Sequence, residues 1–304
     1  MPHSENDILR LIKGATPERQ EELEQLWDSY RPNFRYLDDS PGFTLEVRFD
    51  HVVTTQRTVD QLWFASSVCI QSAKVFYSHL VTTKAGEVPL NPQALADDVD
   101  YTQEVEALAK LWQQFRELGR AALPGDFCWP NDIVPLPQPE RPLDNREAQA
   151  IFDIVGLALS FWFLHEVRHL RFDAEETRPT DPAEEEVICD TYAWEFMLRD
   201  IAAYHELSKE PIDKVQSKRR LGVAVGLATV LAVTAVAAQT NGTHPPSSER
   251  LLMFIDTNVD NPDAGCWALL ASMLLSMLPN DVRNRPLAPF SDYRALAREI
   301  IQRF

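Results

Sequence analysis

The chain has 304 residues, of which 45% are hydrophobic, and it carries a formal net charge of −17. A sequence of this length can bury a substantial core, either as one large domain or as two lobes. The acidic balance argues against nucleic acid as a partner, because phosphate binding requires a basic surface. It also argues, less strongly, against anionic membrane surfaces. The four cysteines are scattered and form no CxxC pair, which disfavours a disulfide framework or a structural zinc ribbon.

The N-terminal half predicts helices around a small sheet. The first thirty residues are typical of one or two short helices. Residues 42–49 alternate between apolar and polar side chains, which predicts a strand, and we expect it to continue after a kink through Val52 and Val53. Long helices are predicted over 59–81 and 102–119, with a loop over 84–100.

Prolines are concentrated between residues 124 and 143, where they exclude a regular helix or a central strand. This stretch is the predicted boundary between an N-terminal α+β lobe over 1–123 and a helical lobe over 144–304. The overall prediction is an α+β fold that is mainly helical, with a small N-terminal sheet. The polar N-terminus lacks the basic and apolar segments of a secretory signal, so we expect a cytoplasmic protein with reduced thiols.

The most informative motif is His165-Glu166-Val167-Arg168-His169, at the end of an apolar run in the expected C-terminal lobe. On a helix, His165 and His169 lie one turn apart on the same face, so their imidazoles can converge on one metal ion. Glu166 projects about 100° further round the helix, which places it to bind the water on the metal and to take its proton. The spacing therefore predicts half of a hydrolytic zinc site.

A second helix is predicted to begin at Asp181, because this residue is a good N-cap and is followed by proline at the first helical position. Along that helix, Glu186, Asp190 and Ala193 share one face. Glu186 is the expected third zinc ligand, and Asp190, one turn later, is expected to accept the free N–H of a ligating histidine. Ala193 supplies the small side chain that lets this helix come close to the metal-bearing one.

Two further glutamates precede Glu186. Glu184 and Glu185 lie in the first turn of the predicted helix, where acidic side chains suit the helix dipole without any further role. Successive residues differ by about 100° in direction, so both should turn away from the metal when Glu186 faces it. We therefore predict that Glu184 and Glu185 are solvated.

A third segment, Gly242-Thr243-His244-Pro245-Pro246 with Arg250 after it, completes a pattern. HExxH, then a glutamate with an aspartate four residues later, then Thr-His-Pro-Pro and an arginine before a new helix resembles the gluzincin metallopeptidases, in particular the membrane endopeptidases of the heat-shock and CAAX-prenyl protease group. The chain length, the absence of flanking membrane spans and the lone apolar helix leading into HExxH resemble the Lit-type phage-exclusion peptidases of bacteria. The resemblance covers roughly residues 145–256.

This resemblance implies a zinc endopeptidase with named roles for five side chains. His165, His169 and Glu186 would hold Zn²⁺. Glu166 would be the general base of peptide hydrolysis, and Asp190 would orient one of the ligating histidines. The cofactor expected is therefore zinc, and the expected partner is a protein or peptide substrate.

The third segment adds two residues whose roles remain open. His244 is a candidate for stabilising the oxyanion of the tetrahedral intermediate. The alternative is that it caps the following helix, with Tyr192 or His205 taking the catalytic role. Arg250 is either an ordinary surface residue or a buried partner for a carboxylate near the site.

The resemblance also implies how a substrate is held and used. In gluzincins an edge strand above the active helix aligns the peptide, and either 42–49 or the extended stretch over 129–137 could supply it. The Lit-type resemblance implies a soluble endopeptidase that acts in phage defence by cleaving a translation factor.

Two features leave alternative functions open. Residues 221–238 carry no charge and follow Lys218-Arg219-Arg220, so they form either a membrane anchor or, as their small side chains favour, a fully buried helix. A lipid-facing segment would indicate a membrane-associated quality-control peptidase. Arg168 departs from the commoner motif, since a guanidinium near the ion would repel it unless an acid neutralises it. That feature favours the second alternative, a catalytically inactive metal-bound scaffold.

Overall fold

The computed structural model describes residues 5–37, 42–86, 99–135, 145–234, 244–283, 285–287 and 289–304. The fold is α+β and mainly helical, with one small sheet, as the sequence predicts. The N-terminal elements are α1 (Glu5–Ala15), η1 (Pro17–Arg19), α2 (Gln20–Tyr30), β1 (Asn33–Leu37), β2 (Leu45–Arg48), β3 (His51–Thr55), α3 (Gln56–Gly86) and α5 (Val99–Arg120). They are followed by η2 (Pro124–Asp126), α6 (Arg146–Glu175), α7 (Pro182–Leu198), α8 (Ile201–Ser208), α9 (Ile212–Thr234), α10 (Ser247–Thr257), α11 (Gly265–Met277), α12 (Asn280–Arg283) and α13 (Tyr293–Ile301).

The three strands form a sheet in the order β1-β3-β2, in which β1 runs parallel and β2 antiparallel to β3. The predicted strand is present as β2, but its continuation through a kink is wrong. The chain instead reverses at Phe49 and Asp50, both of which have positive φ, and Arg48 pairs with His51 across the turn. Asp50 tolerates this conformation, but Phe49 rarely adopts it and neither glycine nor asparagine stands here, so the turn signal in the sequence was weak. β1 was not predicted.

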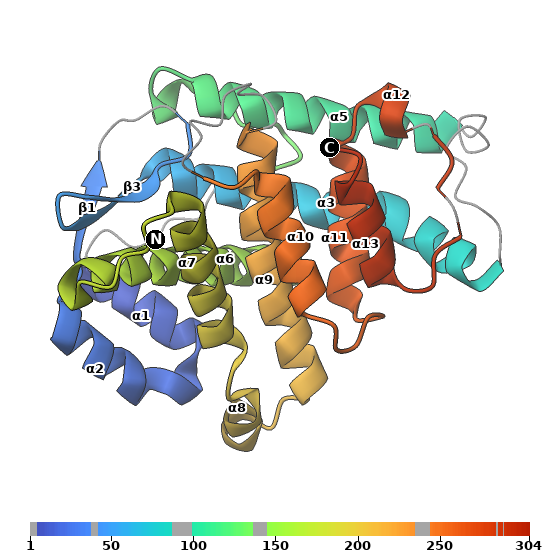
Figure 1. The fold of residues 1–304 in the computed structure, drawn as a ribbon. Helices are drawn as coiled ribbons and strands as arrows, with labels where there is room; N and C mark the ends of the chain where they lie inside the picture. The colour runs from blue at the N-terminus through green and yellow to red at the C-terminus, as the bar shows by residue number, and fades with distance from the viewer. Residues whose placement is uncertain are drawn as a thin grey trace.

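Helix α6 lies at the centre of the molecule and contacts α1, α3, α7, α9 and the sheet (Figure 1). Its N-cap is Asn145, whose side chain accepts a hydrogen bond from the backbone N–H of Glu147. The apolar run from Phe161 to Leu164 is buried on all sides, because α6 has neighbours around most of its circumference. This helix therefore holds the HExxH motif within the core.

Helix α9 packs closely along α6 and contains the segment considered as a membrane anchor. A Cβ at Gly222 would lie 2.3 Å from Leu157 Cβ, so only glycine allows this approach. Between 221 and 234 most side chains of α9 are buried, as expected for the buried-helix alternative, while 235–238 lie outside the described residues. In the described part of the chain, α6 alone is long and apolar enough to cross a membrane, and 78% of that stretch is buried.

Helix α7 begins where the sequence predicts, with the Asp181 side chain accepting from the Ala183 backbone N–H. Its C-terminal end is fixed by two buried arginines: Arg19 donates to the Phe196 carbonyl oxygen and Arg219 to the Met197 carbonyl oxygen. Both ends of α7 are thus anchored, which sets the position of the side chains that it turns toward α6.

The long N-terminal helices agree with the sequence and extend further than predicted, as α3 and α5. Residues 87–98 of the predicted loop and residues 136–143 of the proline-rich stretch lie outside the described residues. Apolar residues from both sides of 124–143 contribute to one core, in which α3 packs against α6 and α11. The division into two lobes at that stretch stays a prediction.

Candidate metal centre

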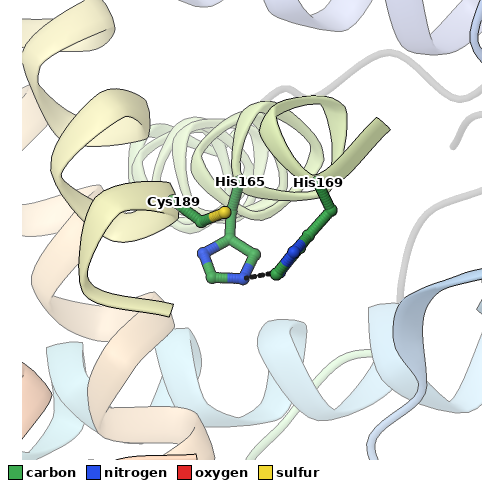
Figure 2. Close-up of side chains that lie close together, drawn as sticks. All are labelled: His165, His169 and Cys189. Carbon is green, nitrogen blue, oxygen red and sulfur yellow. Dashed lines mark hydrogen bonds between the residues drawn. The ribbon is translucent and has the colours of Figure 1, made fainter. Parts of the chain in front are cut away.

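Two histidines of α6 face each other across a short gap. His165 and His169 project from the same side of the helix, and their Nε2 atoms lie 3.1 Å apart (Figure 2). The side chain of His165 is 3% exposed and that of His169 is 12% exposed. Each Nδ1 atom is engaged by a carboxylate, so each ring offers its Nε2 to a shared point.

Helix α7 brings a carboxylate to the same point. Glu186 Oε2 lies 3.4 Å from His165 Nε2, and Glu186 Oε1 lies 3.3 Å from His169 Nε2. A tetrahedral zinc ion with bonds of about 2.0–2.1 Å separates its ligand atoms by roughly 3.3–3.4 Å. The separations of 3.1, 3.3 and 3.4 Å are close to that spacing, although the two contacts of Glu186 are made by different carboxylate oxygens. Three electron-pair donors that converge in a buried site are chemically suited to a divalent cation.

Cys189 offers a further donor from α7. Its Sγ lies with the ligand nitrogens of His165 and His169 in a group whose atoms are all within 4.8 Å of one another (Figure 2). Burial raises the pKa of the Cys189 thiol, and nearby carboxylates raise it further, whereas metals bind the thiolate. Burial also acts to raise the pKa of Glu186, but hydrogen bonds to imidazoles hold it well below its usual range. Because its carboxylate oxygens also lie 3.3–3.4 Å from both Nε2 atoms, Glu186 is the stronger candidate for the third ligand.

A buried carboxylate fixes the ring of His165 from behind. His165 Nδ1 donates to Asp190 Oδ1 at 2.9 Å, the contact that the sequence predicts. Arg250 donates to the same carboxylate through Nε at 2.7 Å and Nη2 at 2.6 Å, so the buried-partner alternative for Arg250 is confirmed. Burial pushes the pKa of Asp190 upward, but Arg250 and His165 lower it overall. Burial would lower the pKa of His165, yet its hydrogen bonds to Asp190 and Glu186 raise it to about 9.

The prediction that Glu185 is solvated is wrong. Glu185 is 7% exposed, and its Oε1 accepts a hydrogen bond from His169 Nδ1 at 2.6 Å. The same oxygen accepts from Arg178 Nη1 at 2.5 Å. The argument from helix direction failed because a glutamate turned by about 100° from Glu186 can still reach the back of a neighbouring imidazole. Glu184 is exposed, as predicted.

Glu166 lies beside the two imidazoles, as the HExxH spacing predicts. Its Oε1 is 3.8 Å from His165 Nε2, and its side chain is 6% exposed. Burial raises the pKa of Glu166 to about 7, although the two nearby histidines act to lower it. A carboxyl group with this pKa exchanges protons readily near neutral pH.

His244 reaches the centre from the segment before α10, while Gly242 and Thr243 of the same motif lie outside the described residues. The Nδ1 atom of His244 is 3.0 Å from Glu186 Oε1, and its side chain is 60% exposed. This hydrogen bond raises the pKa of His244. No side chain caps α10, so the alternative that His244 serves as a helix cap is not supported.

The two substitutes for His244 lie in other surroundings. The Tyr192 ring packs beside Arg168 and Arg171 and against the hydrophobic core. His205, on α8, has its Nδ1 atom 2.6 Å from the Glu210 backbone oxygen. His244 is therefore the best placed of the three to meet a substrate at the cluster formed by His165, His169 and Glu186.

Comparison with known proteins gives one match. The model of the Peptidase U49 family matches residues 52–270, which is more than two thirds of the chain. The chain belongs to the Peptidase U49 family. No curated protein and no solved structure matches it. The match supports the peptidase class that the motif resemblance implied, and it extends well beyond the motifs into the N-terminal half.

The charge of Arg168 is directed away from the two histidines. Its guanidinium lies over the Phe172 ring and donates to Glu175 Oε2 at 3.3 Å, so it is neutralised by an acid and turned toward the end of α6. The arginine in the HExxH motif therefore does not place an unpaired positive charge beside the two histidines.

Glu185 is the site residue that sequence reasoning missed. Its signal was present as a run of three glutamates, but the run did not show which of them faced inward.

Proposed function

We propose that this U49 family member is a zinc-dependent endopeptidase whose ion is held by His165 Nε2, His169 Nε2 and the Glu186 carboxylate. The observation that carries the proposal is the convergence of these three side chains from two neighbouring helices, with contacts of 3.1, 3.3 and 3.4 Å between the imidazole nitrogens and the carboxylate oxygens. Structural zinc sites close the fourth position with protein, whereas hydrolytic sites leave it for water or substrate. A third ligand from Cys189 is the competing arrangement within this proposal.

A zinc ion bound there would lower the pKa of a coordinated water to about 7 and polarise the carbonyl of the scissile bond. Glu166 would accept the proton from the attacking water and deliver it to the leaving amine as the C–N bond breaks. Its pKa of about 7, raised by burial, suits both directions of transfer. The net reaction adds one water across one peptide bond.

His244 would stabilise the negative charge that develops on the carbonyl oxygen. It is exposed, so a substrate can reach it, and its hydrogen bond to Glu186 favours the protonated, donating form of the ring. Replacement by alanine should lower kcat while leaving zinc content unchanged, because His244 touches Glu186 without being one of the three ligands.

The substrate would be a peptide or protein segment in extended form. β2 is an edge strand of the sheet and contacts α6, the helix that carries the histidines. An edge strand of this kind binds an extended chain through its main-chain groups. Of the two stretches considered for this role, 42–49 therefore has the clearer support, and 129–137 extends beyond the described residues.

The Glu166→Gln variant tests the proposed function. The amide cannot accept the water's proton, so cleavage of a fluorogenic peptide library should fall by about 10²–10⁴-fold, with zinc content and fold retained. Glu184→Gln is the matched control, since it makes the same chemical change on an exposed side chain. Cleavage by Glu166→Gln at the rate of the control would show that the base or the reaction is wrong.

No observation in the described residues favours either alternative function, the membrane-associated peptidase or the inactive scaffold. A membrane-associated peptidase needs a lipid-facing 221–238 segment, but most side chains of α9 are buried against other helices. An inactive scaffold was favoured by Arg168, but the charge of this residue is directed to Glu175.

The resemblance to Lit-type peptidases extends the proposal to a cytoplasmic protein substrate and to phage defence. That extension rests on the resemblance alone, and phage challenge of cells expressing wild type or Glu166→Gln would test it.

A further inference from the structure

We propose that Glu185 and Arg178 form a second orienting relay, which positions His169 as the Asp190–Arg250 pair positions His165. The proposal rests on the proposed function, because it concerns the metal site assigned above. It makes Glu185 and Arg178 positioning residues: neither touches the ion, and both act through the ring of His169.

The relay is a continuous chain of short contacts. His169 Nδ1 donates to Glu185 Oε1 at 2.6 Å, and Arg178 Nη1 donates to the same oxygen at 2.5 Å. Arg178 is itself held by Asp173, which accepts from its Nη2 at 2.7 Å and its Nε at 3.1 Å. The carboxylate of Glu185 is thus fixed between a guanidinium and an imidazole, with 9% of its side chain exposed.

The same chemical order occurs on the other histidine. There the imidazole of His165, the carboxylate of Asp190 and the guanidinium of Arg250 are joined by contacts of 2.9, 2.7 and 2.6 Å. In both cases the carboxylate keeps the proton on Nδ1, leaves Nε2 free for a metal and makes that nitrogen more basic. In both cases the guanidinium compensates a carboxylate that would otherwise be buried without a counter-charge.

The two relays differ in exposure and in the segment that carries the arginine. The side chain of Arg250 is 8% exposed, whereas that of Arg178 is 43% exposed. Arg178 lies in the connection between α6 and α7, the two helices that supply the ligands. Its bonds to Asp173 at the end of α6 and to Glu185 at the start of α7 therefore hold those helices in register. Because solvent screens exposed charges, the Arg178 relay should be the weaker of the two.

The adjacent Glu184 provides a matched control for Glu185. Both glutamates are in the first turn of α7 and have the same effect on its dipole, but Glu184 is exposed and Glu185 is buried against His169. A difference between Glu185→Ala and Glu184→Ala therefore reports the contact with His169. Charge and helix propensity change equally in the two variants.

The test measures zinc affinity of the full-length protein by competition with a chelating dye, and the absorption spectrum of the Co²⁺-substituted protein. Glu185→Ala should weaken zinc binding by about 10–100-fold and change the Co²⁺ spectrum, while Glu184→Ala stays within about twofold of wild type. Glu185→Gln, which keeps an acceptor for Nδ1, should recover part of the loss. This variant also replaces Glu185→Ala in the comparison if the latter does not fold.

A double-mutant cycle separates a relay from independent contributions. Arg178→Ala should weaken zinc binding less than Glu185→Ala, and it should have no further effect in the Glu185→Ala background. Equal zinc affinity for Glu185→Ala and Glu184→Ala would overturn the relay. It would also be overturned if Arg178→Ala weakened zinc binding as much in the Glu185→Ala background as in wild type. A shift in the unfolding of metal-free Glu185→Ala with unchanged zinc affinity would also overturn it. Absence of zinc binding by wild type would instead overturn the proposed function.

Discussion

Helix α6 contacts its two main neighbours by opposite physical means. Along α9 the buried contact is steric: Gly222 lies directly against Leu157 and Gly226 against Trp162. The ion pair from Lys218 of α9 to Asp153 of α6 lies at the exposed edge of this contact. We call this contact the glycine seam. Along α7 the contact is made by charged and imidazole groups around Glu186, with buried carboxylates paired to arginines or histidines. The seam depends on shape, whereas the polar contact depends on every charge keeping its partner.

This difference determines what each region can do. A steric contact contributes stability through close packing, and it is complete without a ligand. The polar contact concentrates ligand nitrogens and oxygens at one point, where a divalent cation could take the place of the protons that now join them. The α9 contact therefore contributes stability alone, whereas the α7 contact contributes stability only while its charges stay paired and also supplies the groups for chemistry. Substitutions should separate the two.

The largest effect on stability is expected from Arg250→Ala. The substitution leaves Asp190, which is 0% exposed, without its guanidinium partner, and breaking a buried ion pair in this way costs about 3–5 kcal/mol. Arg298→Ala is the control, because its pair with Asp256 is about half exposed and should contribute less than about 1 kcal/mol. Urea denaturation of both variants measures the difference. Equal stability of the two would mean that the polar contact does not depend on charge pairing.

Gly222→Ala should destabilise the glycine seam by about 1–3 kcal/mol. The new Cβ would lie 2.3 Å from Leu157 Cβ, an atom attached directly to the α6 backbone, so the two helices must separate. Gly14→Ala is the control, since nothing lies within 4 Å of a Cβ there. It should be neutral or slightly stabilising in the α1 helix. If Gly222→Ala unfolds at the same denaturant concentration as Gly14→Ala, the seam is not sterically closed.

Asp60→Asn should give a smaller, pH-dependent gain in stability. Burial raises the pKa of Asp60 to about 6, and its hydrogen bond from Gln56 and the charge of Arg57 offset only part of that effect. A carboxyl group whose folded pKa exceeds its unfolded pKa costs stability as pH rises through both values. The variant should therefore be more stable than wild type by about 1–2 kcal/mol at pH 7.5 and equal to it below pH 4. A constant difference at both pH values would show that ionisation of Asp60 is not the cause.

The sequence predicted the parts of the site that depend on spacing within one helix. His165, Glu166 and His169 follow from the helical repeat, and Glu186 and Asp190 follow from the same repeat once Asp181 is recognised as an N-cap. The long helices were equally accessible, because their apolar periodicity extends over many residues. These predictions needed no knowledge of how the helices pack.

What the sequence did not predict depends on contacts between elements. The inward position of Glu185 follows from the rotation of α7 relative to His169, and the Arg178 contact follows from the path of the connection between the helices. The hairpin at Phe49 and Asp50 was missed because Phe49 is not typical of positive φ and no glycine or asparagine stands at the turn. The sequence could not show that α9 packs closely against α6, because glycines in an apolar helix are also typical of a membrane span.

The most direct test of the central claim is the zinc content of purified wild type beside Glu186→Ala and Cys189→Ala. The ligand geometry predicts about one zinc ion per chain in wild type and in Cys189→Ala, and none in Glu186→Ala, because the carboxylate meets both imidazole nitrogens at 3.3–3.4 Å. Retention of zinc by Glu186→Ala together with its loss from Cys189→Ala would contradict the assignment and identify sulfur as the third ligand.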